Sequence, residues 1–437
     1  MSAGAEPRPA TAPLSDEGQT LAEKILSRAS GLPAVRPGQI IVGRVDLAMA
    51  HEQGAQAILP FHQMGARRVF DPERVVIVLD HWVPASTEGA AGLHQMLRRF
   101  AQEQHLPHFY DVGRHGICHQ ILAEDGWVVP GDLAVGTDSH TNMLGAMGAF
   151  AVGIGPTEYA AVLATGKIWL KVPPTVRVSV EGSLRKGVYA KDLVLRILGE
   201  VKVTGATYKA VEFDGGTVRS LSMPERFTLC NMTTEMGAKA GMIAPDSNTL
   251  DYLEGIAKHP MAPLVPDTDA HYERTVKVDV GELEPQVACP YSPDNVRPLA
   301  DVAREHVHID QAFLGSCTNA RMEDLRQAAE IFRGEKVAPG VRFIVSPAST
   351  SIYRECLKEG LIDLFVEGGA VFTNSSCSAC FGGNMGLLTP TEVCASSSNR
   401  NFPGRMGAKE ARIYLMSPAA VALSAIRGEI SDPREVL

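Results

Sequence analysis

Three cysteines have the spacing that is most informative about chemistry. Cys377 and Cys380 form a Cys-x-x-Cys pair in the segment VFTNSSCSACFGG, and Cys317 lies 60 residues before the pair in LGSCTNAR. A structural zinc ion and a fully ligated iron–sulfur cube each take four protein ligands. Three thiolates on a four-iron cluster would leave one iron open, free to act as a Lewis acid on water or a substrate oxygen. A redox-active Cys-x-x-Cys pair and ordinary buried cysteines are the alternatives.

Carboxylates and histidines form a second group of candidates. A carboxylate beside a histidine fixes the tautomer of the ring and raises its basicity, which suits the pair to proton transfer near neutral pH. Taken singly, each residue has a simpler interpretation, such as a core histidine for His119 or a helix N-cap for Asp138. Their joint occurrence favours a proton-transfer site. The candidates are Asp80, His81, His119, Asp138, His140 and Glu235.

Two arginines lie on either side of a Pro-Gly turn in the segment SNRNFPGRMG. Because guanidinium groups bind carboxylates through paired hydrogen bonds, Arg400 and Arg405 are candidates for binding a small di- or tricarboxylate. A solvated basic loop is the alternative. The uncharged run from Ser396 to Ser398 and the glycines after the turn favour a buried polar loop.

Short apolar runs precede most of these residues. The runs cover residues 74–79, 132–135, 311–314 and 370–372, and they lead into DH, GTDSHT, GSCTNAR and TNSSCSAC. Such runs are typical of strands that are buried in a parallel sheet. In open α/β sheets, ligand sites collect beyond the carboxyl ends of the strands. The sequence therefore predicts an α/β fold whose strand ends bring these residues into one site.

Shifts in composition predict three domains behind a short leader. Residues 1–20 are rich in Ala and Pro and are expected to be disordered, whereas helical spacing begins at Leu21. The composition changes after KVPP at 171–174 and again in the Pro-rich stretch 284–298. The predicted domains are residues 21–173, 174–288 and 289–437. The glycine-rich segment 145–155 lacks a phosphate-binding pattern, so we expect it to allow close helix packing.

The overall composition limits the classes of function. A chain of 437 residues, 45% hydrophobic and 21% charged, is long enough for two or three soluble domains. A formal net charge of −9 argues against a nucleic-acid or membrane-surface partner, and no apolar run has the length of a membrane span. The eight scattered cysteines indicate reduced thiols. The leader carries acidic residues and lacks signal-peptide features, so a cytoplasmic protein is expected.

Four motifs also carry a resemblance to a known family. GTDSHT, GSCTNAR, the Cys-x-x-Cys pair and SNRNFPGRMG occur in the order and approximate spacing of the aconitase superfamily. Within it, the segments TGKIWLKVPP, GAKAGMIAPD and CTNARMEDLR resemble the large subunits of 3-isopropylmalate dehydratase and, nearly as closely, of homoaconitase. The resemblance runs from about Leu21 to the C-terminus. It implies three α/β domains of the α/β/α type around a central cluster, and a hydro-lyase activity.

The resemblance assigns roles to individual residues. It implies that Cys317, Cys377 and Cys380 hold a [4Fe–4S] cluster with one iron that has no protein ligand. It implies that His81, oriented by Asp80, protonates the leaving hydroxyl group. The residues implied around the iron-bound oxygen are His119, Asp138, His140 and Glu235, and those implied near substrate or the cluster are Ser139, Asn231, Asn399, Arg400 and Arg405.

The resemblance also implies a partner subunit and a substrate class. Single-chain aconitases continue beyond the position of Leu437 into a swivelling domain that supplies the base for the carbon-bound proton. We therefore expect a separate small subunit to supply it, in a heterodimer. The favoured substrate is 3-isopropylmalate, in leucine biosynthesis, with homoaconitate and dimethylmalate or citramalate as alternatives. Ser376, Ser378 and Ala379 stand where many relatives carry proline or glycine, so the cysteine loop is expected to differ in shape.

Two other classes of function fit part of the sequence. One is an iron or redox sensor that binds RNA when its cluster is lost, against which the acidic balance argues. The other is a protein without catalysis, whose zinc ion is bound by the three cysteines and a histidine.

Overall fold

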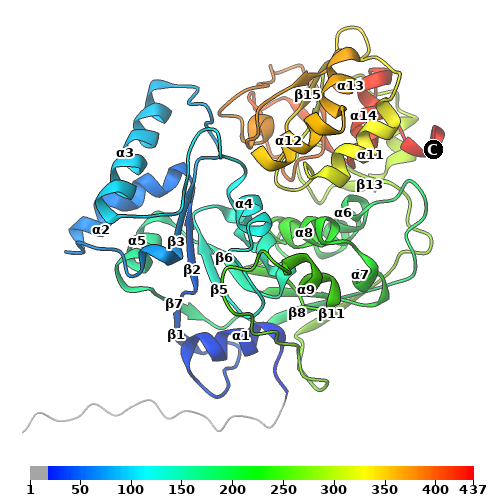
Figure 1. Cartoon of the computed structure of the whole chain (residues 1–437). Helices are drawn as coiled ribbons and strands as arrows, with labels where there is room; N and C mark the ends of the chain where they lie inside the picture. Colours follow the sequence, from blue (N-terminus) through cyan, green and yellow to red (C-terminus); the bar gives the residue numbers. More distant parts are fainter. Residues whose placement is uncertain (1–17) are drawn as a thin grey trace, which may run out of the picture.

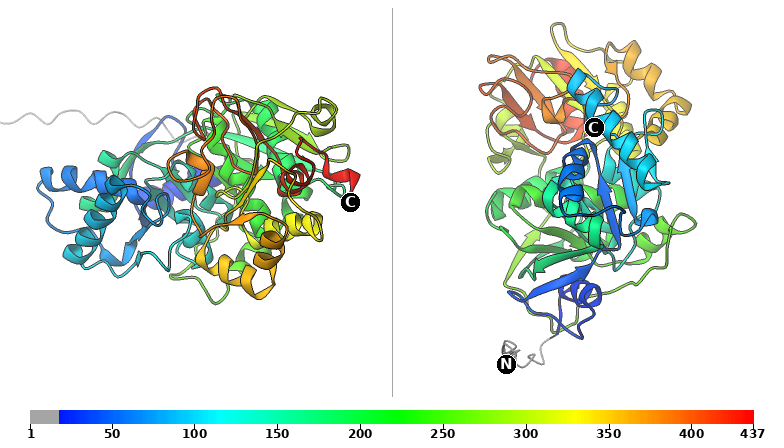
Figure 2. Two further views of the ribbon diagram at one scale, coloured as in Figure 1. Left: turned by 90° about the horizontal axis from the view of Figure 1, so that it is seen from above. Right: turned by 90° about the vertical axis from the view of Figure 1, so that its left-hand side faces the viewer.

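The computed structural model of the chain describes residues 18–437. It contains three large sheets, and Figure 1 shows them in three groups of elements that follow one another along the chain. In the right-hand view of Figure 2, the yellow-to-red part of the chain lies above the green part. Most of the predicted leader, residues 1–17, lies outside the described residues. Gly18 forms a β-bridge with Ala270 and Thr20 caps the first helix, so the end of that leader is folded.

The first group is built on a five-stranded parallel sheet in the order β4-β3-β2-β5-β6. Every residue of β3 is buried, as expected for a strand that is covered on both faces. The strands of this sheet are β2 (Leu47–Ala50), β3 (Val75–Val78), β4 (Phe109–Tyr110), β5 (Leu133–Gly136) and β6 (Phe150–Gly153). A separate antiparallel pair consists of β1 (Ile40–Arg44) and β7 (Lys167–Lys171). The helices, where η marks a 3-10 helix, are α1 (Leu21–Ser30), η1 (Glu52–Ala57), α2 (Ile58–Gln63), η2 (Pro72–Arg74), α3 (Glu88–Gln104), α4 (Cys118–Glu124), η3 (Ser139–Met147) and α5 (Pro156–Thr165).

The second group is built on a four-stranded parallel sheet in the order β10-β9-β8-β11. Its strands are β8 (Thr175–Glu181), β9 (Ala210–Asp214), β10 (Ala240–Ile243) and β11 (Arg274–Asp279). Its helices are α6 (Ala190–Val201), α7 (Gly216–Ser220), α8 (Met223–Met232), η4 (Thr233–Met236) and α9 (Ser247–Leu253).

The third group is built on a seven-stranded sheet in the order β13-β12-β18-β17-β14-β15-β16, in which β12 pairs antiparallel with both of its neighbours and the other pairs are parallel. Its strands are β12 (Gln286–Ala288), β13 (Val296–Pro298), β14 (Gln311–Leu314), β15 (Arg342–Val345), β16 (Val371–Phe372), β17 (Val393–Ser396) and β18 (Arg412–Leu415). Its helices are α10 (Leu299–Ala303), α11 (Met322–Phe332), α12 (Thr350–Lys358), α13 (Leu361–Glu367), η5 (Ser378–Phe381), α14 (Pro418–Arg427) and η6 (Pro433–Glu435).

A shared hydrophobic core joins the three groups. The largest cluster of buried apolar side chains runs from Leu47 in β2 through Phe213 in β9 to Leu415 in β18, and two further clusters lie mainly in the first and third groups. The predicted α/β class is confirmed. The sheets change near the predicted domain boundaries, although β12 belongs to the third sheet and begins at Gln286, before the predicted start at residue 289. No helix in residues 18–437 is both long and apolar enough to span a membrane.

Gly145 allows two backbones to approach each other closely. It lies in η3, and a Cβ at this position would be 1.8 Å from the carbonyl oxygen of Gly241 in β10. The glycine-rich segment therefore serves close packing, but between a 3-10 helix and a strand and not between two α-helices. Because η3 also carries His140, this contact fixes His140 relative to the second group.

Candidate active site

The predicted site residues follow the carboxyl ends of strands in two different sheets. Asp80 and Asp138 follow β3 and β5, while Cys317 and Cys377 follow β14 and β16. The two sheet edges meet, because the amide of Cys377 donates a hydrogen bond to Asp80 Oδ1 at 3.2 Å. The amide of Cys118 donates to Asp80 Oδ2 at 3.0 Å. One buried carboxylate thus joins the acid–base loop to the cysteine loop.

His81 lies between two carboxylates. Its Nδ1 atom is 3.5 Å from Asp80 Oδ2, and its Nε2 atom is 3.7 Å from Asp138 Oδ2. Burial alone would lower the pKa of His81, but Asp80, Asp138 and Glu52 raise it to about 9. The imidazole is therefore protonated at neutral pH and can donate a proton from Nε2.

His119 has the opposite character. Its Nδ1 atom lies 3.9 Å from Asp138 Oδ1 and 3.5 Å from Cys118 Sγ. Burial lowers the pKa of His119 to about 4, so this ring is neutral at neutral pH and is not a proton source. Asp138 also accepts a hydrogen bond from the amide of His140 at 2.7 Å and thereby caps η3. Asp138 is therefore a helix cap that also lies beside His81 and His119.

His140, Glu235 and Arg400 form a chain of polar contacts toward the solvent. His140 Nε2 is 2.9 Å from Glu235 Oε1, which accepts a hydrogen bond from Arg400 Nε at 2.8 Å. Arg400 Nη2 also donates to the hydroxyl of Ser139 at 3.2 Å. Burial would raise the pKa of Glu235, but His140 and Arg400 hold it below its usual value. Arg400 thus already pairs with a carboxylate of the protein itself, whereas the sequence suggested that it binds a small di- or tricarboxylate.

The predicted cysteine ligands are buried, and polar groups approach their sulfur atoms. Asn399 Nδ2 donates to Cys317 Sγ at 3.1 Å, and the hydroxyl of Ser316 lies 3.4 Å from Cys380 Sγ. Arg405 Nη2 lies 3.5 Å from the same Cys380 sulfur. Burial raises the pKa of the Cys317 thiol to about 12, so a metal group would be needed to keep it as a thiolate.

The spacing of the sulfur atoms distinguishes between kinds of metal group. The sulfur ligands of one zinc ion each lie about 2.3 Å from it, so they lie within about 4 Å of one another. Within residues 18–437, three donor atoms come within 4.8 Å of one another only in the sets His51, His81, Asp138 and Asp80, His81, Cys377. The three predicted cysteine ligands do not form such a set. At least one pair of their sulfur atoms is therefore more than 4.8 Å apart, which does not match the ligand spacing of a single zinc ion.

Asn231 lies beside the same cysteines. Its Oδ1 atom accepts hydrogen bonds from Asn399 Nδ2 and from the hydroxyl of Thr318, both at 3.2 Å. Its Nδ2 atom is buried and has no hydrogen-bond partner in the protein. A buried donor without a partner is costly unless another acceptor is present, and the sulfides of a cluster would be acceptors of that kind.

Serine residues determine part of the backbone conformation of the cysteine loops. Ser378, between the two cysteines of the pair, has a φ angle of 51°, and Ser316, next to Cys317, has a φ angle of 80°. These left-handed conformations favour glycine, so each serine is held there by its surroundings. The amide of Ser378 donates to the Ser376 hydroxyl at 3.1 Å, which stabilises the turn.

An open pocket of about 470 Å³ adjoins these residues. Its wall includes Glu235, Arg400, Arg405 and Phe381. The ring of Phe381 packs edge to face against His81, with ring centroids 4.8 Å apart. Arg405 Nε is buried and has no hydrogen-bond partner, so this guanidinium can still bind an anion. Two residues of the pocket wall thus contact the predicted site, Phe381 through His81 and Arg405 through Cys380.

Sequence analysis missed two residues that follow β2. The ring of His51 stacks on His81 with centroids 4.3 Å apart, and its Nε2 atom lies 4.0 Å from Asp138 Oδ2. Glu52 is fully buried and accepts hydrogen bonds from the loop after β3. The signal was present, because β2 is a short apolar run that ends directly in His51 and Glu52.

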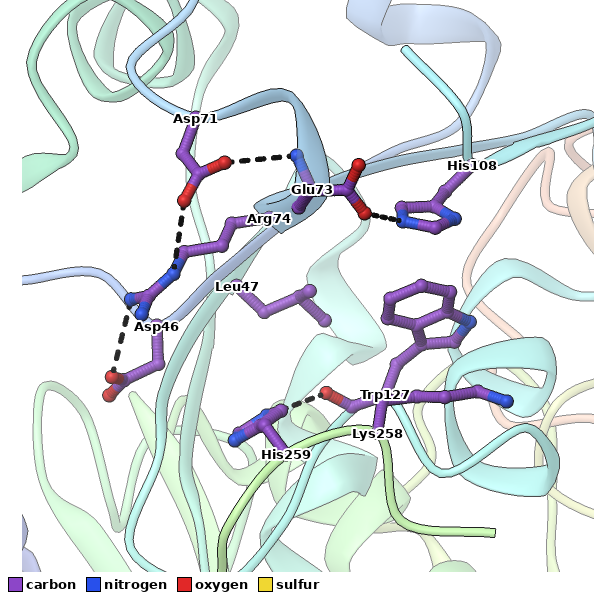
Figure 3. Close-up of a pocket in the computed structure, with 9 residues that line it drawn as sticks. All are labelled: Asp46, Leu47, Asp71, Glu73, Arg74, His108, Trp127, Lys258 and His259. Carbon is purple, nitrogen blue, oxygen red and sulfur yellow. Dashed lines mark hydrogen bonds and ion pairs between the residues drawn. The ribbon is translucent and has the colours of Figure 1, made fainter.

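A second pocket, of about 340 Å³, lies at the opposite ends of the strands. It is bordered by Leu47 at the start of β2 and by Arg74 just before β3, and Figure 3 shows Leu47 between Arg74 and Trp127. Its charged groups largely pair with one another, as Glu73 does with His108 at 2.9 Å. None of the predicted site residues lines it, so it is not part of the candidate active site.

Comparisons with known proteins identify the family of the chain. Residues 23–428 match the family described as the aconitase family (aconitate hydratase). The chain belongs to the aconitase family. The predicted hydro-lyase class is thereby confirmed.

Several relatives match this aconitase-family chain over nearly its whole length. The 3-isopropylmalate dehydratase large subunit 1 of Methanopyrus kandleri is 52% identical over 421 residues, which cover 96% of this chain and 100% of the relative. The 3-isopropylmalate dehydratase large subunit of Aquifex aeolicus is 48% identical, with 96% and 98% covered. A probable methanogen homoaconitase large subunit of Methanosarcina mazei is 49% identical, with 90% and 99% covered.

One solved structure resembles the fold. The crystal structure of Thermococcus kodakaraensis aconitase X, in its holo-form, matches with a TM-score of 0.51 and 12% sequence identity, and the match covers 85% of this chain and 88% of that one. At this identity the similarity concerns the fold alone, and it supports the α/β architecture.

Proposed function

We propose that this chain is the large, cluster-binding subunit of a hydro-lyase that interconverts 2-isopropylmalate and 3-isopropylmalate in leucine biosynthesis. The observation that carries the proposal is that Asp80 joins a protonated His81 to the loop of Cys377. Proton donor and predicted metal ligands thus belong to one buried site. Relatives named 3-isopropylmalate dehydratase large subunit, about half identical over nearly the whole chain, support the choice of substrate.

The proposed cofactor is a [4Fe–4S] cluster bound by Cys317, Cys377 and Cys380, with one iron that has no protein ligand. It is supported by the unpartnered Asn231 Nδ2 and by the three sulfur atoms, which do not all lie within 4.8 Å of one another as the ligands of one zinc ion would. When bound, the cluster would supply a Lewis acid for the substrate hydroxyl and carboxylate. Asn399, which donates to Cys317 Sγ, would hold that sulfur in place.

The side chains of this chain have separate proposed tasks. His81 donates the proton from Nε2 to the leaving hydroxyl, and Asp80 and Asp138 keep the ring charged and oriented. Neutral His119, with His140, lines the oxygen-binding side of the site. Arg405 binds a substrate carboxylate from the pocket, while Glu235 and Ser139 fix Arg400 at its rim.

The proposed partner is a small subunit with a swivelling domain, which supplies the base that removes the carbon-bound proton. The name "large subunit" of the relatives supports a small-subunit partner. A cytoplasmic location is proposed from the eight free, buried cysteines, which a reducing compartment keeps as thiols. Domains at 21–173, 174–288 and 289–437 are proposed as the units around the site, with β12 contributed to the third sheet.

Anaerobic reconstitution tests the cofactor, and a substrate panel tests the reaction. We expect about four iron and four sulfide ions per chain, lost in Cys317→Ser and kept in Cys356→Ser, a buried cysteine in α12. The reconstituted chain, mixed with its small subunit, is expected to dehydrate 3-isopropylmalate fastest among 3-isopropylmalate, homocitrate and citramalate. Stoichiometric zinc without sulfide would contradict the cofactor, and inactivity on the whole panel would contradict the reaction.

A second candidate reaction has specific support. The Methanosarcina mazei relative, a probable methanogen homoaconitase large subunit, is 49% identical to this chain. A higher kcat/KM for homocitrate than for 3-isopropylmalate in the same panel would replace the proposed substrate and leave the proposed cofactor unchanged.

A further inference from the structure

The side chain of Glu52 is a buried carboxylate that binds three successive backbone amides. Its Oε1 atom accepts hydrogen bonds from the amides of Asp80 at 2.9 Å and Trp82 at 3.1 Å, and its Oε2 atom accepts one from the amide of His81 at 3.0 Å. Glu52 begins η1 directly after β2, whereas the three amides belong to the loop after β3. One side chain therefore fixes the backbone of the whole Asp80–His81–Trp82 turn.

Two histidines keep this carboxylate charged in its buried place. His94 Nε2 lies 3.4 Å from Glu52 Oε1, and His51 Nδ1 lies 3.6 Å from Oε2. Burial would raise the pKa of Glu52, but the neighbouring His51 and His94 rings hold it well below the usual value. An ionised carboxylate accepts hydrogen bonds only, which matches a turn that presents three donors.

The turn that Glu52 binds makes contacts with both halves of the site. Asp80 accepts hydrogen bonds from the amides of Cys118 and Cys377, and Trp82 Nε1 donates to the carbonyl of Gly383 at 2.9 Å. A shift of this turn would therefore move His81 relative to Asp138 and to the cysteine loop together.

We propose that Glu52 is a positioning residue that sets the place of the His81 ring by fixing the backbone amides of residues 80–82. The proposal rests on the proposed function for its effect on turnover. Its effect on the turn itself is independent of any reaction. A misplacement of about 1 Å of a catalytic group costs about 100-fold in rate.

The substitution Glu52→Gln tests the proposal with little change in shape. One carboxylate oxygen becomes an NH2 group, which would face at least one backbone N–H with a second donor. Glu212→Gln is the matched control, because Glu212 is also buried and also accepts a backbone hydrogen bond, from Ala22 at 2.9 Å, but outside the site.

Two measurements separate positioning from a general structural role. In Glu52→Gln, hydrogen–deuterium exchange of the peptide covering residues 79–83 is expected to accelerate at least about tenfold, while peptides from the third group keep their rates. The kcat of the reconstituted enzyme with its small subunit is expected to fall about 10- to 100-fold with KM changed less than about twofold. Iron and sulfide content should stay at the wild-type level, and Glu212→Gln should match wild type in all of these respects.

Each possible outcome decides the proposal. Unchanged exchange at residues 79–83, or faster exchange with unchanged kcat, would overturn it. If Glu52→Gln does not fold, Glu52→Asp replaces it, since its shorter side chain keeps the charge but cannot reach all three amides. If the wild-type enzyme is inactive on every substrate, the proposed function fails, and the exchange measurement still shows whether Glu52 fixes the turn.

Discussion

Two buried histidines near one carboxylate differ in charge because their other neighbours differ. His81 has Asp80 on one side and Asp138 on the other, and its pKa rises to about 9. His119 Nδ1 lies 3.9 Å from the other oxygen of Asp138, Oδ1, and burial lowers the pKa of His119 to about 4. In such pairs, the environment and not the residue type assigns the proton donor. The structure therefore favours His81 as the acid.

The substitution Asp80→Asn should shift the alkaline limit of activity. His81 must be protonated to donate, so the wild-type kcat/KM should fall only as the pH rises toward about 9. The substitution would remove the largest favourable charge on that ring, so the pKa of His81 falls and activity should be lost at a pH at least about one unit lower. The pH profile of kcat/KM measures the shift.

Iron and sulfide content is the control for Asp80→Asn, because Asp80 also binds the amide of Cys377. A variant with full cluster content and an unshifted alkaline limb would show that another group is the acid.

The two arginines of the Pro-Gly turn show how similar residues receive different tasks. Arg400 is bound by Glu235 at 2.8 Å, whereas Arg405 Nε has no partner and its Nη2 atom lies near Cys380. The two arginines flank the same Pro-Gly turn in the sequence, but the contacts that the fold gives them differ.

At the scale of elements, one helix is attached to the loop that carries Asn399. Lys191, in α6 of the second group, is fully buried, and its Nζ atom donates to the carbonyls of Ser397 at 2.6 Å and Ser398 at 2.7 Å. These carbonyls follow β17 of the third sheet. Like Glu52, this buried polar side chain binds the backbone of a site loop and not a side chain. Burial lowers the pKa of Lys191 to about 7.

Lys191→Met should destabilise the protein because it removes the amino group that donates hydrogen bonds to two buried carbonyls. We expect the free energy of unfolding to fall by about 2–4 kcal/mol, as measured by urea denaturation. Lys202→Met, at the exposed end of the same helix, is the matched control and should change it by less than about 0.5 kcal/mol. An equal effect of the two substitutions would show that the buried hydrogen bonds contribute little.

At the scale of the whole molecule, the site is assembled from all three groups. His81 and His140 come from the first, Glu235 from the second, and the cysteines and Arg405 from the third. The apolar cluster shared by all three groups holds these residues in fixed positions relative to one another. A ligand that binds Cys317 and Cys377 would therefore act on the stability of the assembled chain.

Reconstitution with iron and sulfide should raise the melting temperature. A group bound only by the folded chain, at a concentration about 100 times its Kd, adds about 2.7 kcal/mol, which corresponds to a rise of about 3 °C for a chain of 437 residues. Differential scanning calorimetry under anaerobic conditions measures it. Cys317→Ser should abolish the rise and Cys356→Ser should retain it, whereas an equal rise in both would place the metal elsewhere.

The amino-acid sequence was sufficient to predict the buried strands and the loops that follow them. Runs such as Val75–Val78 and Gln311–Leu314 form buried strands because of their own apolar composition, so the residues directly after them lie at the carboxyl edge of a sheet. Cysteine spacing and the motifs were sufficient for the family, which the comparisons confirm.

The division of tasks among the site residues became visible only in the folded chain. Folding placed His51 and Glu52 in the site, gave Arg400 a partner and left Arg405 Nε without one, and brought β12 into the third sheet. The physical reason is that pKa values and hydrogen bonds depend on burial and on groups contributed by distant segments. Local composition carries no record of such neighbours, and they exist only once the three sheets have packed around one core.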